Sequence, residues 1–206
     1  MTTTRIISSL DPESIPLAIK TFNSGGLVVF PTDTVYGLAV PIHNQAGIDK
    51  LFEVKGRDFN KAIAVLIGDL DHLSQLTTGF SALAQKLATA YWPGALTLVV
   101  GIRPGLPPNL SPYPTIGIRM PDHPFALALL QKTGPLATTS ANISGGSNTT
   151  TAQEVLIQLD GKIDLLVEGG TTPGAVPSTV VDCTKPDLAI LRQGSITEND
   201  LKRVLD

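Results

Sequence analysis

The chain has 206 residues, of which 42% are hydrophobic and 16% charged, and this balance excludes an intrinsically disordered or coiled-coil protein. Fifteen lysines and arginines against eighteen acidic residues give a net charge of −3, the opposite of what a nucleic-acid-binding surface usually needs. A basic site is therefore expected to be a local pocket. The single cysteine, Cys183, excludes an internal disulfide and a cysteine-based zinc site, and its apolar neighbours favour a place in the core.

Helix and strand signals alternate along the chain. Residues 11–26 predict a helix that ends near Asn23, because an acidic start and early prolines lead to a glycine stop, and a buried strand follows over 26–30. Further helices are predicted over residues 44–56, 81–92, 124–134, 151–161 (with a capping box of Thr151 and Glu154) and 197–205. Further strands are predicted over residues 62–68, 95–102, 115–120, 135–141, 163–170, 178–183 and 188–194. Several strands follow each other without a helix, so we predict an α/β fold with a twisted, mixed sheet flanked by helices.

No composition break, linker or internal repeat divides the chain, so we expect residues 1–206 to form one domain. No apolar segment is long enough to cross a bilayer, and the opening "MTTTRIISSLDPESI" lacks the apolar stretch of a secretion signal. A cytoplasmic protein without a membrane partner is therefore expected.

Polar residues interrupt the pattern where predicted strands end. These interruptions are residues 31–38, 118–124, 138–148, 177–182 and 192–194. Because ligands of α/β sheets collect outside the strand ends, one cleft is expected to gather these loops.

The stretch "KGRDFNKAI" brings three cations, Lys55, Arg57 and Lys61, into nine residues. On an extended segment or turn Lys55 and Arg57 point to the same side, which suits gripping one multiply charged anion. The alternative from the residues alone is a solvated, charged turn.

Common nucleotide and hydrolase signatures are missing from the chain. It has no G-x-x-x-x-G-K-[ST], G-x-G-x-x-G, G-x-S-x-G or H-E-x-x-H motif. Of three scattered histidines only His123 falls in a candidate site loop, where a structural role is as compatible with the sequence as a functional one. Fixed cations, hydroxyls and amides remain, and they suit the positioning and charge stabilisation of phosphates.

Each polar motif also has a structural alternative. The segment Ser140–Asn142 is compatible with a simple turn, and the hydroxyls of "PTDT" with a turn cap. Arg119 and Arg192 follow apolar strand residues, where an unpaired cation is costly, so the alternative for Arg119 is a structural salt bridge.

Seven stretches together resemble the YrdC family, the threonylcarbamoyl-AMP synthases. They are "GGLVVFPTDTVYGL", "KGR", "YWPGALTLVV", "IGIRMPDHP", "GPLATTSANISG", "GAVPSTVVD" and "LRQGSI", in family order. The resemblance is strongest over residues 25–196 and is closest to single-domain members. It implies a twisted α/β domain around a large, positively charged cavity. It also implies a reaction in which threonine, bicarbonate and ATP, with Mg²⁺, give threonylcarbamoyl-AMP and pyrophosphate, the first step of threonylcarbamoyladenosine formation in tRNA.

The resemblance carries roles to individual residues. For ATP they are Lys55, Arg57, Thr115, Ser140, Asn142, Asn148 and Arg192, with Lys55, Arg57, Ser140 and Asn142 as the catalytic set. For threonine they are Thr32, Tyr36, Arg119, Thr138 and Ser178. Arg119 is the natural partner of the amino acid carboxylate. No metal-ligating residue is carried over.

The loop after Arg57 departs from the family pattern. Asp58 and Ala62 stand where relatives commonly have prolines, which leaves the conformation of this loop and the role of Lys61 open. The product is expected to pass to the machinery that transfers threonylcarbamoyl to tRNA, and the sequence leaves direct tRNA binding open. Two other classes compete with this assignment: a non-catalytic RNA-binding module, and a phosphatase or nucleotide hydrolase.

Overall fold

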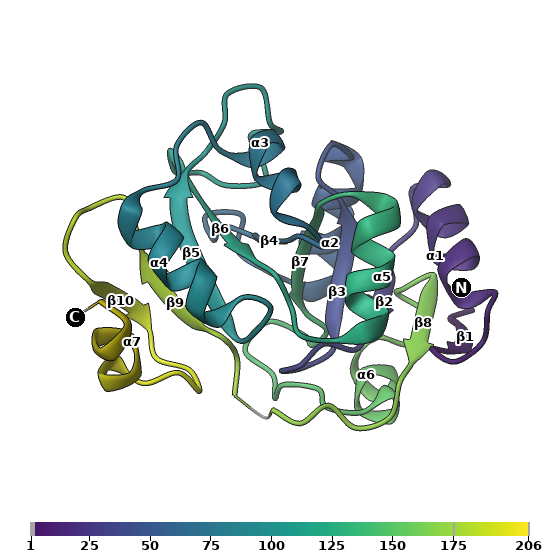
Figure 1. The fold of residues 1–206 in the computed structure, drawn as a ribbon. Helices are drawn as coiled ribbons and strands as arrows, with labels where there is room; N and C mark the ends of the chain where they lie inside the picture. Colours follow the sequence, from purple (N-terminus) through teal and green to yellow (C-terminus); the bar gives the residue numbers. More distant parts are fainter. Residues whose placement is uncertain (1–2, 175, 206) are drawn as a thin grey trace.

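The computed structural model describes residues 3–174 and 176–205, and its elements alternate as the sequence predicts (Figure 1). The strands are β1 (Arg5–Ser8), β2 (Val28–Phe30), β3 (Gly37–Pro41), β4 (Ala64–Leu66), β5 (Leu96–Gly101), β6 (Thr115–Arg119), β7 (Leu136–Ser140), β8 (Leu165–Glu168), β9 (Thr179–Asp182) and β10 (Ala189–Arg192). The helices are α1 (Ser14–Asn23), α2 (Gln45–Lys55), α3 (Leu73–Leu76), α4 (Ala82–Tyr91), α5 (Pro124–Thr133), α6 (Ala152–Leu159) and α7 (Glu198–Leu205), with a 3₁₀ turn over Leu70–His72.

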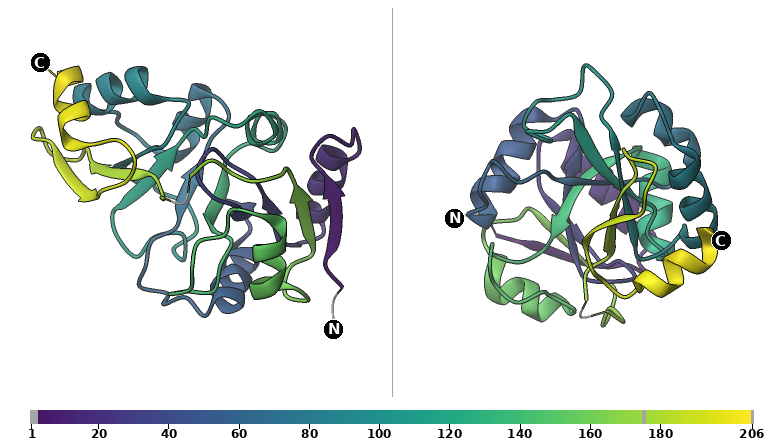
Figure 2. Two further views of the ribbon diagram at one scale, coloured as in Figure 1. Left: turned by 90° about the horizontal axis from the view of Figure 1, so that it is seen from below. Right: turned by 90° about the vertical axis from the view of Figure 1, so that its left-hand side faces the viewer.

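All ten strands form one sheet in the order β1-β8-β2-β3-β7-β4-β6-β5-β9-β10. The pairs β1–β8, β2–β8, β4–β6 and β5–β9 are parallel and the other pairs are antiparallel, so the mixed α/β fold is confirmed. Because β1 and β10 are the two edges, the termini lie at opposite ends of the molecule (Figure 2).

Every predicted helix and strand is present, but the sequence missed four elements. Strands β1 and β3, helix α3 and the 3₁₀ turn before it were not predicted. The capping box of α6 is confirmed, because the Thr151 hydroxyl accepts from the Glu154 amide while the Glu154 carboxylate accepts from the Thr151 amide. Among residues 3–174 and 176–205, no helix has the length and apolarity that a membrane span requires.

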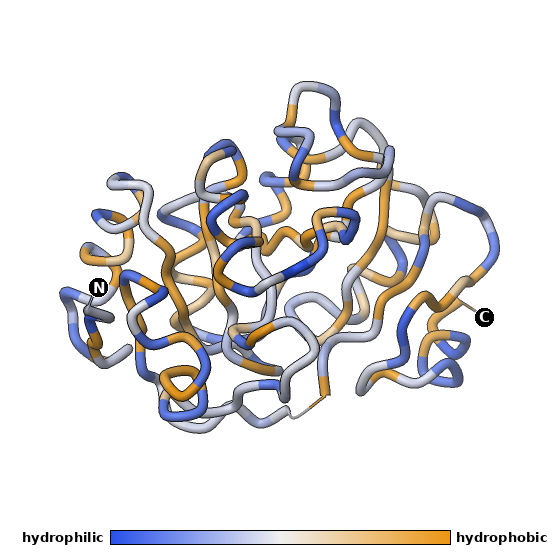
Figure 3. The backbone as a smooth tube through the Cα atoms, turned by 180° about the vertical axis from the view of Figure 1, so that it is seen from behind, coloured by the Kyte–Doolittle hydropathy of each residue, from blue (hydrophilic) through white to orange (hydrophobic). Residues whose placement is uncertain are grey.

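Two hydrophobic clusters hold the helices to the sheet. The smaller packs α1 and α5 through Phe22 and Phe125 against one face of the sheet near β2. The larger packs α2, α4, α6 and α7 against the remaining apolar strand residues. The hydrophobic stretches accordingly run through the central strands, whereas many hydrophilic ones lie in loops (Figure 3). Cys183 belongs to the larger cluster, and burial, with the charge of Asp182, raises the pKa of its thiol to about 12, which confirms its core role.

Helix α2 fixes where the charged loop begins. The Asn44 side chain caps its start by accepting from the Gly47 amide, and Gly56 ends it in the left-handed conformation at φ +56°. Lys55 is therefore the last residue of a helix, and Arg57 follows a sharp turn. Of the two settings expected for this pair, an extended segment or a turn, the extended segment is wrong.

Candidate active site

A cavity of about 350 Å³ lies on one face of the sheet, across six neighbouring strands. The strand residues that line it are Gly37, Ala64, Leu66, Thr97, Val99, Gly117, Arg119, Thr138, Thr139, Ser140 and Val180. Most of them are alternate residues, as expected where one face of a strand is exposed. Loops add further lining residues, among them Thr32, Arg57, Asn148, Ser178 and Arg192. The expectation that one cleft gathers the five polar stretches is confirmed, because each of them contributes lining residues, and the strands add a floor that was not predicted.

Small residues keep the floor of the cavity open. A methyl group added at Gly117 would lie 3.1 Å from Cγ2 of Thr97, and one at Gly37 would lie 3.0 Å from Cγ2 of Thr138. Both are tighter than ordinary packing, so side chains there would push the neighbouring threonines. Glycine at these strand positions marks close approach by another group, as expected at a ligand site.

Three arginines, Arg57, Arg119 and Arg192, line the cavity, and its described lining contains no acidic residue. Burial lowers the pKa of each guanidinium. The charge of Arg192 also lowers the pKa of both Arg57 and Arg119, so Arg192 lies near the other two. Like charges held together in a partly buried space favour the binding of an anion.

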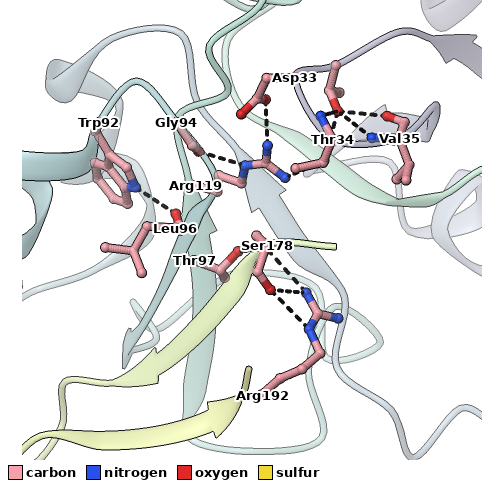
Figure 4. A network of polar contacts seen from close by, with 11 residues as sticks. Asp33, Thr34, Val35, Trp92, Gly94, Leu96, Thr97, Arg119, Ser178 and Arg192 are labelled. Atoms are coloured by element: carbon pink, nitrogen blue, oxygen red, sulfur yellow. Dashed lines mark hydrogen bonds and ion pairs between the residues drawn. The ribbon is translucent and has the colours of Figure 1, made fainter. Parts of the chain in front are cut away.

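Arg119 is 6% exposed and is held by three hydrogen bonds (Figure 4). Its Nε donates to the Gly94 carbonyl at 2.9 Å, its Nη1 to Oγ1 of Thr34 at 2.9 Å, and its Nη2 to Oδ1 of Asp33 at 2.5 Å. The salt bridge that was the structural alternative is therefore present. A guanidinium has five N–H groups, so two stay unused among the described contacts, the number that a carboxylate accepts.

Arg192 lines the cavity and is hydrogen-bonded to Ser178 (Figure 4). Its Nε and Nη2 donate to the Ser178 carbonyl at 3.1 and 2.8 Å, and Nη2 also donates to Oγ of Ser178 at 3.1 Å. The same Oγ lies 2.7 Å from Oγ1 of Thr97. The three residues form one polar group on the wall of the cavity.

Arg57 carries a donor without a partner. Its Nη2 donates to the Ala62 carbonyl at 2.9 Å, but its Nε is buried with no hydrogen-bond partner in the structure described. A buried donor left unsatisfied costs about 1–3 kcal/mol, so an acceptor bound here would stabilise the site.

Lys55 does not line the cavity. Its side chain is 2% exposed, and Nζ donates to the backbone carbonyls of Ser140, at 2.5 Å, and of Asn142. The alternative of a solvated, charged turn is therefore wrong for Lys55. Lys55 links the end of α2 to the turn that carries Ser140 and Asn142, so it supports the site without lining the cavity.

Lys55 should give the protein a measurable pH dependence of stability. Burial, together with the charge of Arg57, lowers the pKa of Lys55 from 10.5 to about 7. Between these values the unfolded chain holds a proton that the folded chain has released, so the free energy of unfolding rises with pH across that window, by at most about 1.4 kcal/mol per pH unit. In Lys55→Met this rise should disappear. Denaturant unfolding at pH 7, 8 and 9 measures it, with exposed Lys61→Met as the matched control that keeps the rise; parallel profiles for both variants would contradict the assignment.

The Ser140–Asn142 motif forms a closed turn. The Ser140 hydroxyl donates to Oδ1 of Asn142 at 2.5 Å, and the Asn142 amide donates to the carbonyls of Ile143 and Gly146. Ser140 lines the cavity and Asn142 stands behind it. The structure thus brings Ser140, Asn148 and Arg57 to the cavity, whereas Asn142 and Lys55 support them. Thr115 lies just outside the cavity, on the same face of β6 as Gly117 and Arg119.

The residues predicted to bind threonine differ in what they offer. The hydroxyl of Thr138 donates to the Leu136 carbonyl at 3.0 Å and so presents lone pairs to the cavity, whereas the hydroxyl of Thr32 donates to the Val35 carbonyl at 2.7 Å and accepts from the amides of Thr34 and Val35. Tyr36 lines the cavity, as expected, although its side chain is fully buried and its hydroxyl bonds the backbone at Gly169 and Gly170. His123, whose Nδ1 is buried without a partner in the described structure, stands at the start of α5 outside the cavity lining.

Sequence reasoning missed Thr97, Thr34 and Asp33 as members of the site. Thr97 lies on the cavity face of β5, and Thr34 and Asp33 fix Arg119. A signal for Thr97 was present, because it is the polar residue in the otherwise apolar run "ALTLVV". No group of three or more histidines, cysteines or carboxylates that could hold a metal is found among the described residues.

Comparison with known proteins gives one consistent result. The family model Sua5_yciO_yrdC, described as telomere recombination, matches residues 20–194. A Bacillus subtilis (strain 168) protein named threonylcarbamoyl-AMP synthase is 40% identical over 202 residues, which are 97% of this chain and 58% of that protein. A Mycobacterium tuberculosis (strain H37Rv) protein named putative threonylcarbamoyl-AMP synthase is 34% identical over 207 residues, 98% of this chain and 95% of that protein.

Solved structures agree with the sequence matches. The crystal structure of Pyrococcus abyssi Sua5 complexed with L-threonine is similar to the whole chain with a TM-score of 0.92 at 32% identity, and the match covers 61% of that protein. The chain therefore spans about three fifths of the length of its Bacillus subtilis and Pyrococcus abyssi relatives. Because the family model matches most of the chain and each of these relatives exceeds 30% identity along nearly all of it, the chain belongs to the Sua5/YciO/YrdC family.

Proposed function

We propose that the chain is a threonylcarbamoyl-AMP synthase, a nucleotidyltransferase that makes threonylcarbamoyl-AMP and pyrophosphate from threonine, bicarbonate and ATP. The observation that carries the proposal is a cavity lined by three arginines and no described acidic residue. Two N–H groups of Arg119 stay unused among the described contacts, the number that a carboxylate accepts. Family membership and the names of its relatives support the same activity.

The strand register gives the cavity two distinct ends. Leu66 pairs with Arg119, and Ala62, which accepts from Arg57, lies four positions earlier along the same strand direction. At about 3.3 Å per residue the two anchoring points are roughly 13 Å apart. Ser140 belongs to the Ala62 end, because Thr138 pairs with Ala64 and Ser140 continues past it. We assign the carboxylate of threonine to the Arg119 end and the phosphates of ATP to the end with Arg57, Ser140 and Asn148.

The chemistry needs charge stabilisation and exclusion of water more than a general acid or base. The threonine nitrogen bonds to the carbonate carbon, and the resulting carbamate oxygen attacks the α-phosphorus while pyrophosphate leaves. A carbamate decomposes in open water, so a cavity that shields it is required. Each fixed cation near the transferring phosphoryl group contributes about 3–4 kcal/mol of transition-state stabilisation when judged by single-donor removals in other enzymes.

Magnesium fits this site as part of the nucleotide substrate. The donor set facing the cavity is made of guanidinium groups, hydroxyls and amides, whereas magnesium prefers carboxylate oxygens and water. The phosphate oxygens of ATP would therefore hold the ion, and the protein would hold the phosphates. We further propose that the product serves threonylcarbamoyladenosine formation in tRNA and passes to the transfer machinery in the cytoplasm.

Pyrophosphate release with each substrate omitted in turn tests the proposal. Full activity is expected only when threonine, bicarbonate and ATP are all present. Release that continues without threonine would favour a nucleotide hydrolase, the competing enzyme class. Salt-dependent RNA binding with no turnover under any condition would favour an RNA-binding module, which the net charge of −3 already disfavours.

An amino acid series completes the same experiment. Serine lacks one methyl group of threonine and should be used less well by about 10–200-fold at most. Valine keeps the shape but lacks the hydroxyl, so the lone pairs of Thr138 would lose a donor; a site that reads a hydroxyl in this way rejects such an analogue by about 10⁴-fold. Equal use of valine and serine would show that the pocket reads shape alone.

A further inference from the structure

The proposed reaction requires a subsite that no comparison assigns. The carbonate carbon bonds first to the nitrogen of threonine, and one of its oxygens then bonds to the α-phosphorus of ATP. The carbonate must therefore lie between the amino acid and the phosphates, held by donors that suit an oxyanion. Such a subsite should contain polar groups that lie beside the threonine end and within reach of the phosphate end.

Arg192, Ser178 and Thr97 meet this description. Leu98 of β5 pairs with Ile118 of β6, so Thr97 and Arg119 are cross-strand neighbours, and both face the cavity. Ser178 and Thr97 share a hydrogen bond of 2.7 Å, and Arg192 donates to Ser178. Arg192 lines the same cavity as the other two arginines, and its charge acts on both Arg57 and Arg119. The group thus stands beside the threonine end and reaches toward the phosphate end.

The unused donors of this group match an oxyanion. Arg192 makes its described hydrogen bonds through Nε and Nη2, and Figure 4 shows its third nitrogen directed away from Ser178. The planar guanidinium therefore keeps the two N–H groups of Nη1 for a ligand. The two hydroxyls of Ser178 and Thr97 share one hydrogen bond between them, so one hydroxyl hydrogen is left over whichever of them donates.

From this geometry we propose that Arg192, with the hydroxyl pair Ser178–Thr97, binds bicarbonate and then the carbamate formed from it. The proposal rests on the proposed function; it moves Arg192 from the phosphates, and Ser178 from threonine, to the carbonate. In the step concerned, the amine of threonine forms an N–C bond to the carbonate carbon and releases one proton. One carbon–oxygen bond breaks, and the departing hydroxide takes that proton and leaves as water. The two oxygens that remain carry the negative charge that Arg192 and the hydroxyl hold.

Three variants separate this role from its alternatives. Thr97→Val keeps the shape of a residue that is 5% exposed but removes its hydroxyl, whereas Thr97→Ser keeps the hydroxyl. Thr89→Val, on the exposed surface of α4, is the matched control. Steady-state pyrophosphate release in degassed buffer gives KM for bicarbonate, threonine and ATP in each. Thr97→Val should raise the bicarbonate KM about tenfold, as expected for a lost hydrogen bond to a charged group, with the other two KM values within about twofold. Thr97→Ser should restore most of the bicarbonate affinity that Thr97→Val loses, and Thr89→Val should stay near wild type.

Other outcomes overturn the proposal. A threonine KM that rises as much as the bicarbonate KM would place Thr97 in the amino acid site, and no change in any KM would leave it as packing. If Thr97→Val does not fold by circular dichroism, Arg192→Lys decides, because lysine keeps the charge but loses the planar pair of donors. A selective rise in the bicarbonate KM supports the proposal, and a selective rise in the ATP KM returns Arg192 to the phosphates. Failure of the proposed function is distinct: the wild-type protein would then release no pyrophosphate in response to threonine and bicarbonate.

Discussion

Arg57→Ala is expected to lower kcat for pyrophosphate release by about 10²–10³-fold, the effect of removing one preorganised electrostatic donor from an active site. The guanidinium has one hydrogen bond to the Ala62 carbonyl and a buried Nε without a partner in the described structure. Burial and the nearby charge of Arg192 both lower its pKa, so the free protein holds this cation at a cost. The bound phosphate gains negative charge in the transition state, so its interaction with Arg57 is strongest at that point. Removing Arg57 should therefore lower kcat.

Lys61→Ala is the matched control for Arg57→Ala. Lys61 stands in the same loop, carries the same charge and is exposed, so its removal should change kcat by less than about twofold. Circular dichroism should show an intact fold for both variants, because Arg57 contributes to neither hydrophobic cluster. Activity of Arg57→Ala within tenfold of wild type would remove Arg57 from the phosphate site.

The order of elements could be predicted from the sequence because it depends on local patterns. Apolar runs, glycine stops and the capping box at Thr151 each act within a few residues, and the structure bears out every element predicted from them. Strand β1 was missed because it is a short edge strand with mostly exposed side chains, so it lacks an apolar run. Strand β3 was missed because the apolar residues Gly37–Pro41 directly follow a polar loop that hid the start of the strand.

The site was harder to predict because it depends on contacts between distant segments. A lysine in a charged stretch is ordinarily exposed, yet Lys55 is buried by carbonyls 85 and 87 positions away, which no local pattern reveals. The cleft that gathers the strand-end loops was predicted, but its floor of strand residues was not, for a related reason. Glycine and alanine at Gly37, Ala64 and Gly117 leave the middle of the sheet face uncovered, and that depends on which strands become neighbours.

Arg119→Lys should weaken threonine binding by at least about tenfold while changing ATP binding by less than about twofold. Arginine offers a planar pair of N–H groups that a carboxylate accepts side by side, whereas lysine offers a single point charge. Here three of the five N–H groups of Arg119 are already used on Gly94, Thr34 and Asp33, so the remaining two are fixed in direction before threonine arrives. Isothermal titration of each ligand separately measures the two affinities.

Lysine is a sharper replacement than alanine because of Asp33. The carboxylate of Asp33 is 13% exposed and its ion pair with Arg119 is 2.5 Å long, so Arg119→Ala would leave it largely buried without its cation, at a cost of about 3–5 kcal/mol in stability. Lysine keeps a positive charge beside Asp33, so Arg119→Lys removes only the directed N–H groups of the guanidinium. Arg103→Lys, at an exposed arginine, controls for the substitution itself. Equal losses of threonine and ATP affinity in Arg119→Lys would make Arg119 a structural residue that holds the Asp33 loop, and threonine would then need another partner for its carboxylate.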